Sequence, residues 1–133
     1  MSSLIPFDDA RTKILAANLG VPIAWPNVTF NKPITPGPWL AVECTSHTID
    51  PIELSGGVWS EEGTVYVDVF VPTGTGTDAA RTLAKSISNI FRGIYTGPVI
   101  YNGGSIGNGS ISENDGMWWV ITVTVQWRYQ DTT

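Results

Sequence analysis

The sequence is poor in charged residues and in cysteine. Only 14% of its 133 residues are charged, against about 25% in a typical soluble domain, while 42% are hydrophobic and 11% are aromatic. A folded subunit with so little charge leaves much uncharged surface, which favours a sizeable buried contact with another subunit. The single cysteine, Cys44, excludes an internal disulfide and predicts a protein made in a reducing cytoplasm.

The sequence also lacks a long apolar run and a basic cluster. No stretch approaches the ~18 apolar residues of a membrane-spanning helix, and the first nine residues lack the pattern of a secretion signal. We therefore expect no membrane contact. The seven basic residues are scattered and the net charge is −5, which argues against a protein that grips nucleic acid. An acidic surface that lets DNA slide past is equally compatible with this charge.

Periodic apolar residues predict two helices in one domain that spans residues 1–133. The first is expected from about residue 8 to 19, with Asp8 or Asp9 as its N-cap and Gly20 as its end. The second begins at Thr77 or Asp78 and ends near Gly93 and Gly97. Its apolar residues recur every three or four positions, which predicts that it covers one face of a sheet; they are Ala80, Leu83, Ala84, Ile87, Ile90, Phe91 and Ile94.

Alternating residues predict the strands. Residues 39–45 form one strand, residues 56–60 lie in or near a second that turns at 61–63, and valines alternate along 65–71. After the second helix, a Gly-rich segment at 102–110 permits a bent or bulged strand, and a turn at 114–116 leads into a long, central last strand. The predicted fold class is α+β, with a largely antiparallel four- to five-stranded sheet and two helices packed on one face.

The segment from Ile23 to Pro33 connects the first helix to the first strand. Its prolines and those at positions 36 and 38 fix φ and remove amide donors, so we expect an extended segment outside any regular ladder. Trp25 and Phe30 must then lie against a surface, which is either this domain's own core or a neighbouring subunit.

The sequence contains no convincing catalytic, cofactor or metal site. Cys44, His47 and Asp50 lie within seven residues, but their spacing on a strand points them to different faces and no oxyanion hole accompanies them. One cysteine and one histidine leave a zinc site short of ligands. The glycines at 72–77 resemble an anion loop without its lysine, and a plain turn before the helix explains them better.

Six tryptophans are the remaining unusual feature. Trp118 and Trp119 are consecutive on a strand and therefore point to opposite faces. Three readings stay open: both faces are covered within one subunit, one tryptophan anchors a subunit contact, or the tryptophans form a sugar-stacking platform.

The order of these segments resembles the tail-terminator family of phages with long, non-contractile tails. The resemblance rests on the first helix, the Trp25-Pro26-Asn27 connector with Phe30, Trp39-Leu40, the valine strand that ends in residues 72–76, the amphipathic helix and the last strand. It covers most of the chain. None of these motifs is chemically diagnostic, so the likeness lies in their order and spacing. The acidic stretch from Glu53 to Glu62 matches no family feature.

The resemblance implies a structural virion protein at the head-proximal end of the tail, assembled in the host cytoplasm. Such a protein forms a homohexameric ring on the tail tube, stops tube polymerisation, and offers a docking surface to a head-completion or stopper protein. DNA passes through the ring without specific binding. It implies no enzyme activity and no cofactor. The expected interface residues are Trp25, Phe30, Trp39, Trp118 and Asn108.

Two rival classes remain. A carbohydrate- or receptor-binding β-rich module is supported by the tryptophans and glycine loops alone, and it predicts saturable sugar binding that quenches tryptophan fluorescence. Another connector or tail tube subunit shares all of these features except the Trp-Pro-Asn connector.

Overall fold

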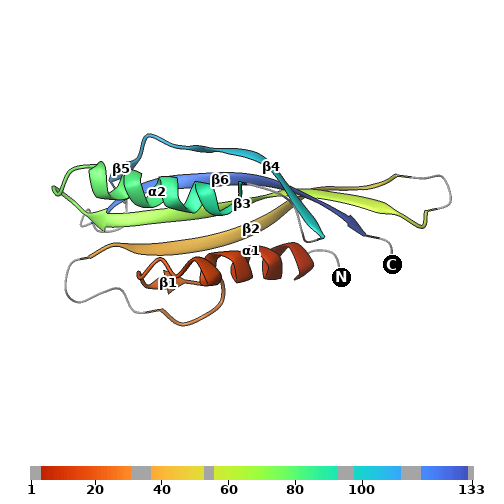
Figure 1. Cartoon of the computed structure of the whole chain (residues 1–133), viewed down its shortest axis with the longest axis horizontal. Coiled ribbons are helices and arrows are strands. Elements are labelled where there is room, and N and C mark those ends of the chain that lie inside the picture. Colours follow the sequence, from red (N-terminus) through yellow and green to blue (C-terminus); the bar gives the residue numbers. More distant parts are fainter. Residues whose placement is uncertain (1–3, 31–36, 53–55, 93–97, 112–117, 132–133) are drawn as a thin grey trace.

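The computed structural model describes residues 4–30, 37–52, 56–92, 98–111 and 118–131, and it has the α+β fold expected from the sequence (Figure 1). The helices are α1 (Leu4–Ala17) and α2 (Asp78–Ile90). The strands are β1 (Ile23–Ala24), β2 (Trp39–Pro51), β3 (Trp59–Pro72), β4 (Val99–Ile106), β5 (Ser110–Ile111) and β6 (Trp118–Asp131). The expected turn at 114–116, the helix end at 93–97 and the prolines at 33 and 36 lie outside the described residues.

The strands form a single mostly antiparallel sheet in the order β1-β2-β3-β6-β4, and β5 also pairs with β6. Only the β1–β2 pair is parallel among the described pairings. The sheet has six strands, slightly more than expected, because β1 and β5 are two residues long and too short to leave a pattern in the sequence. The last strand is central, as predicted, since it lies between β3 and β4.

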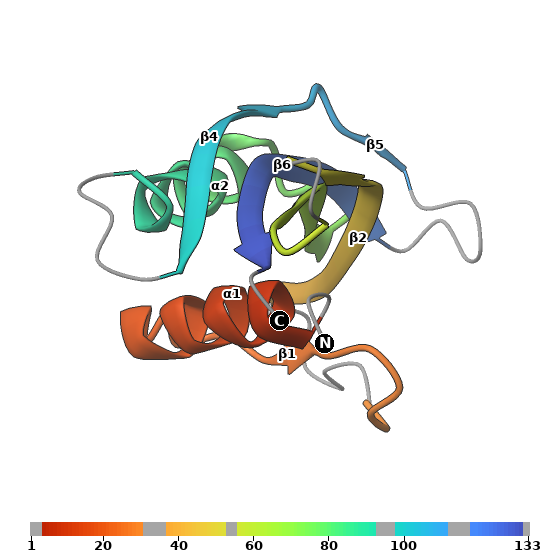
Figure 2. The same ribbon diagram turned by 90° about the vertical axis from the view of Figure 1, so that its right-hand side faces the viewer.

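The core lies between the sheet and the two helices. The valines of β3 face it and are at most 3% exposed, which confirms their predicted common face. α2 covers them with Ala80, Ala84 and Ile87, all fully buried, and α1 adds Ala10 and Ile14 to the same cluster. Both helices therefore pack on one face of the sheet. In Figure 2 α1 runs below β2 while α2 lies beside β4.

The first helix begins earlier than the sequence indicates. α1 starts at Leu4, so Asp8 and Asp9 lie inside the helix and the expected N-cap is wrong. The two carboxylates instead bond to side chains: Asp8 pairs with Arg11 one turn on, and Asp9 accepts a hydrogen bond from Tyr101. Pro6 is tolerated because a helix does not use the amides of its first turn.

The expected turn at Glu61-Glu62-Gly63 is wrong, because β3 runs unbroken from Trp59 to Pro72. A Cβ at Gly63 would meet the Thr45 carbonyl oxygen at 1.9 Å and the Trp127 ring at 2.4 Å. The glycine is therefore required by close packing between strands and not by a reversal of the chain.

The connector is also more regular than expected. Ile23 and Ala24 form β1 and pair with Leu40 and Ala41, so the segment does not lie wholly outside the ladder. The Gly-rich segment behaves as predicted, since the β4–β6 register shifts between Tyr101 and Gly104.

The β2–β3 hairpin is the most extended part of the molecule. It runs past the ends of both helices along the long axis, while α2 lies toward the opposite end (Figure 1). We call residues 43–52 and 56–62 of this hairpin the arm. A β-bulge in the arm between Ser46 and Thr48 inserts His47 as an extra residue.

Candidate functional site

Trp25 is half-buried against the core of its own subunit. Its ring meets Phe7 of α1 edge-on, with centroids 6.4 Å apart. The chain then turns: the Val28 amide donates to the Trp25 carbonyl at 3.2 Å, and Asn27 adopts a positive φ of 56°. This turn leaves the side chain of Val28 60% exposed on the outside of the connector.

Phe30, Trp39 and Trp118 form one aromatic cluster on the face of the sheet opposite the helices. Phe30 stacks on Trp39 at 5.1 Å, Trp39 stacks on Phe70 of β3 at 4.0 Å, and Trp118 meets Trp39 edge-on at 5.8 Å. Trp39 and Trp118 are each 6% exposed, whereas Phe30 is half-buried. The connector thus covers a second apolar layer within the subunit, and Phe30 forms its outer edge.

The two consecutive tryptophans are both largely covered within the subunit. Trp119 points to the helix side, where it is half-buried and packs against the core. A Cβ on Gly109 would meet its ring at 2.2 Å, so the Gly-rich segment lies close over Trp119. Asn108 is exposed in this segment, at the β4–β5 edge of the sheet.

The five expected interface residues therefore fall into separate places. Phe30, Trp39 and Trp118 are brought together, Trp25 lies beside α1, and Asn108 lies at the other edge of the sheet. Connector and Gly-rich segment are thus two different surfaces at opposite sheet edges.

The side chains of Cys44, His47 and Asp50 do not converge. Cys44 lies opposite Val65 on the helix side, His47 occupies the bulge with its Nε2 2.7 Å from Thr64 Oγ1, and Asp50 lies opposite Ser60 on the other face. Burial raises the pKa of the Cys44 thiol to about 11, opposed by the neighbouring Trp127 side chain and reinforced by the Glu61 charge. A thiol held protonated in this way is a poor nucleophile.

A second buried polar contact joins α1 to β4. The Tyr101 hydroxyl donates to Asp9 Oδ2 at 2.5 Å. Burial raises the pKa of Tyr101, and the hydrogen bond with Asp9 raises it further. This contact holds α1 on the sheet.

The glycines before α2 form a turn, as the sequence indicates. Gly74 and Gly76 have φ values of 87° and 83°, and the Thr75 hydroxyl donates to the Pro72 carbonyl at 2.7 Å. Within the described ranges, no three His, Cys, Asp or Glu side chains gather as a metal site. Among the described helices, none is long and apolar enough to cross a membrane.

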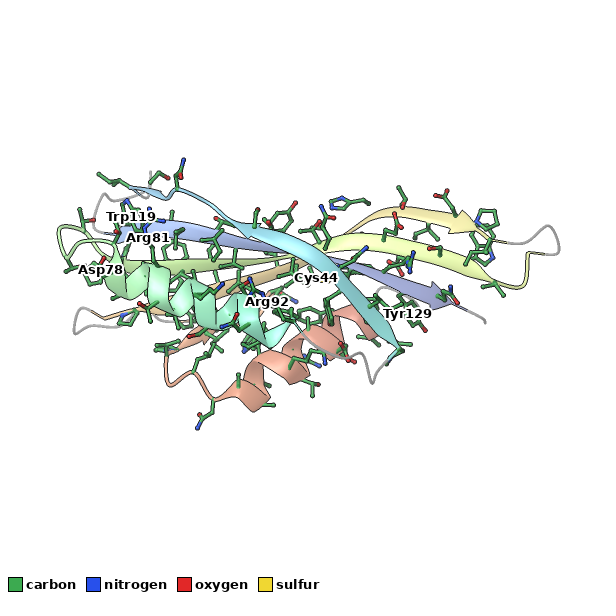
Figure 3. The ribbon with its side chains drawn as sticks, turned by 45° about the horizontal axis from the view of Figure 1, so that its top comes forward. Cys44, Asp78, Arg81, Arg92, Trp119 and Tyr129 are labelled. Atoms are coloured by element: carbon green, nitrogen blue, oxygen red, sulfur yellow. The ribbon has the colours of Figure 1, made fainter. Side chains whose placement is uncertain are left out.

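Two surfaces were missed by sequence reasoning. The first is the arm, which exposes Ile49, Ile52 and Trp59 by 52%, 52% and 37%. The second is the outer side of α2, where Arg81 and Lys85 are one turn apart and Arg92 follows just past the helix end. Figure 3 shows the positions of Arg81 and Arg92. The relation of these cations to the acidic arm depends on the hairpin length and on the bulge.

Comparison with known proteins assigns the fold and the family. A solved structure superposes with a TM-score of 0.65, at 18% sequence identity over 92% of this chain and 97% of that chain, which shows a shared fold. No curated protein sequence matches. The profile of the family described as phage tail terminator protein matches residues 9–127. Since this match spans nearly the whole chain, the protein belongs to the phage tail terminator family.

Proposed function

We propose that the chain forms a homohexameric ring that caps the tail tube, stops its polymerisation, and presents a docking surface for head-completion proteins. Membership of the phage tail terminator family makes it a structural component of the phage tail. The proposal extends that role to the head-proximal end of the tail and to the ring itself. It needs no catalytic residue and no cofactor.

The observation that supports a ring is that opposite edges of the sheet carry unlike surfaces. The connector with Trp25 and Phe30 lies toward the β1–β2 edge, and the Gly-rich segment with Asn108 lies at the β4–β5 edge. Both edges expose apolar side chains, Val28 at 60% and Ile111 at 56%. A closed ring uses two different patches of each subunit, so unlike edges suit it.

We infer that Trp25, Phe30 and Asn108 contribute directly to contacts with neighbouring subunits or with the tube. Trp39 and Trp118 then contribute indirectly: they are covered within the subunit, and their rings pack under Phe30 and hold the connector in place. A sugar platform finds less support, since stacking on a sugar needs an exposed ring and these two tryptophans are covered.

Native mass spectrometry over a series of subunit concentrations tests the proposal. We expect a discrete hexamer, and we expect Trp25→Ala to shift it toward smaller species while Thr12→Ala, an exposed change on α1, leaves it intact. A monomer at every concentration would contradict the ring. A hexamer that Trp25→Ala leaves unchanged would contradict the role of the connector.

A further inference from the structure

We propose that neighbouring subunits of the ring bind through the acidic face of the arm of one copy and the basic face of α2 of the next. This inference rests on the proposed function, because it names the contact that closes the ring. Its partner is a second copy of this chain.

The bulge in the arm brings three exposed carboxylates onto one face. Glu43 and Glu62 point away from the helices, and without an extra residue Asp50 would point to the other side. His47 resets the alternation, so that Thr48 pairs with Glu62 and Asp50 lies on the same face as both glutamates. The cation nearest to them by register is Arg128, opposite Glu62 on β6.

The outer face of α2 carries a matching row of cations. Arg81 and Lys85 are one turn apart on one side of α2, and Arg92 lies two residues past the helix end at Ile90. We call these three cations the stripe. All three are exposed, and the acid nearest along the helix is Asp78 in its first turn. Half of the described Lys and Arg side chains of an acidic protein thus lie in one stripe.

Among the residues that the structure describes, these opposite charges have no ionic partner within the subunit. Over the described ranges, the one pair closer than 4.0 Å is Arg11–Asp8 on α1. The stripe runs from one end of the molecule toward its middle, as the positions of Arg81 and Arg92 in Figure 3 show, while the arm extends from the middle to the other end. A subunit cannot fold its arm back onto its own α2, so the complementary faces meet between two copies.

The spacing of the charges sets the direction of the contact. Along α2 the gap from Arg81 to Lys85 is roughly 6 Å, from the rise per residue of a helix, and Arg92 lies farther on, past the helix end. Along the arm, Asp50 to Glu62 spans roughly 7 Å and Glu62 to Glu43 roughly 13 Å, from the rise of a strand. Counted from the arm tip, the shorter of the two gaps between carboxylates comes first. Counted from the start of α2, the shorter of the two gaps between cations also comes first. This order pairs Asp50 with Arg81, Glu62 with Lys85, and Glu43 with Arg92.

In this direction the arm tip reaches an apolar hollow. Beside the start of α2, a hollow of about 320 Å³ is lined by Pro72, Thr77, Ile111 and Trp119, with Gly74 and Gly76 at its rim. The tip brings the exposed apolar side chain of Ile52, two residues after Asp50, whereas Ile49 and Trp59 lie on the opposite face of the arm. Exposed ion pairs alone contribute little, so the apolar contact supplies affinity while the charges set direction and register.

Charge reversal tests the proposed pairing on the full chain, again by native mass spectrometry. Arg81→Glu and Asp50→Arg should each raise the subunit concentration needed for half-assembly by about tenfold, since an attraction becomes a repulsion at every contact. The double variant should assemble like the unmodified chain. Combining Arg81→Glu with Glu43→Arg should not restore assembly, because those two positions do not face each other.

Mixing the two single variants gives a second, independent readout. Each assembles only at higher concentration alone. An Arg81→Glu subunit and an Asp50→Arg subunit complement each other at both contacts, so the mixture should form a ring with three copies of each at the concentration that suffices for the unmodified chain. Arg11→Glu, a reversal away from the stripe, should leave assembly unchanged. Circular dichroism confirms that every variant is folded.

The outcomes separate the two proposals. If both single variants form the hexamer at the same subunit concentration as the unmodified chain, the arm–α2 contact is overturned. The ring itself then still stands. Rescue by the mismatched pair also overturns it. A monomer for the unmodified chain at every concentration contradicts the ring and, with it, a second copy as the partner.

Discussion

Buried polar side chains are few in this protein, and two of them hold their protons unusually tightly. Cys44 lies beneath the helices near Trp127 and Glu61, and Tyr101 donates to Asp9. Both are raised in pKa chiefly by burial. Neither group has a role in the proposed assembly, so their protonation reports on the stability of the subunit.

We predict that the subunit loses stability as the pH rises from about 9 toward 11. The unfolded chain releases the Cys44 proton near its usual pKa, whereas the folded chain keeps it up to a pKa of about 11. In that window the unfolded state binds fewer protons, so the free energy of unfolding falls with pH. Tyr101 acts in the same direction, since its folded pKa is also raised. Urea denaturation midpoints between pH 8 and the upper end of the window measure the loss.

Removing the two groups provides the control for this pH dependence. Cys44→Ala and Tyr101→Phe should each flatten the alkaline fall, although both lower stability at neutral pH. An equally steep fall in the double variant would assign the effect to other residues.

At the scale of elements, β3 contains a position at which no side chain fits. The strand passes straight through Gly63, where the Thr45 carbonyl and the Trp127 ring leave no room for a side chain. We predict that Gly63→Ala lowers the free energy of unfolding by about 1–3 kcal/mol, the usual cost of overpacking a core position. Urea denaturation measures it as a lower midpoint with an unchanged slope.

Gly107→Ala is the matched control for this substitution. Its Cβ would lie 3.6 Å from the Thr122 carbonyl, an ordinary contact, and the residue is exposed. We expect its effect to stay within about 0.5 kcal/mol. Equal losses for both glycines would contradict the packing argument.

Long, strongly patterned elements could be predicted from the sequence, and short or contact-dependent ones could not. The valines of β3, the apolar side of α2 and the alternation along β6 each record burial of one face, so they are visible without a structure. β1 and β5 exist because a neighbouring strand lies beside them. Gly63 looked like a turn residue because sequence cannot show which side chain lies above a glycine.

The candidate site was only partly accessible to the same reasoning. Sequence pattern identified the connector aromatics and the Gly-rich segment as unusual, but not that Phe30, Trp39 and Trp118 would stack within one subunit. The acidic face of the arm depends on the bulge at His47, which changes the side of every later residue in β2. Local composition gives no sign of that reset.

At the scale of the whole molecule, charge is distributed very unevenly. The chain carries a net charge of −5, and half of its described Lys and Arg residues lie on α2 or directly after it. If α2 is covered by the arm of the next subunit, assembly neutralises the basic surface and leaves a ring with an excess of negative charge. Such a ring repels the DNA that we propose passes through it.

We therefore predict that the assembled protein does not bind duplex DNA. At low ionic strength, where phosphate contacts are strongest, a short duplex should show no mobility shift at subunit concentrations up to about 0.1 mM, the weak end of ordinary non-specific binding. Thr12→Lys combined with Ala16→Lys adds cations to the exposed side of α1, away from the proposed contact, and should produce a shift that disappears with salt, which verifies the sensitivity of the assay. A salt-dependent shift with the unmodified chain would show that its few cations remain accessible after assembly. In that case α2 is not covered by a neighbour, and the passage of DNA requires a different explanation from repulsion.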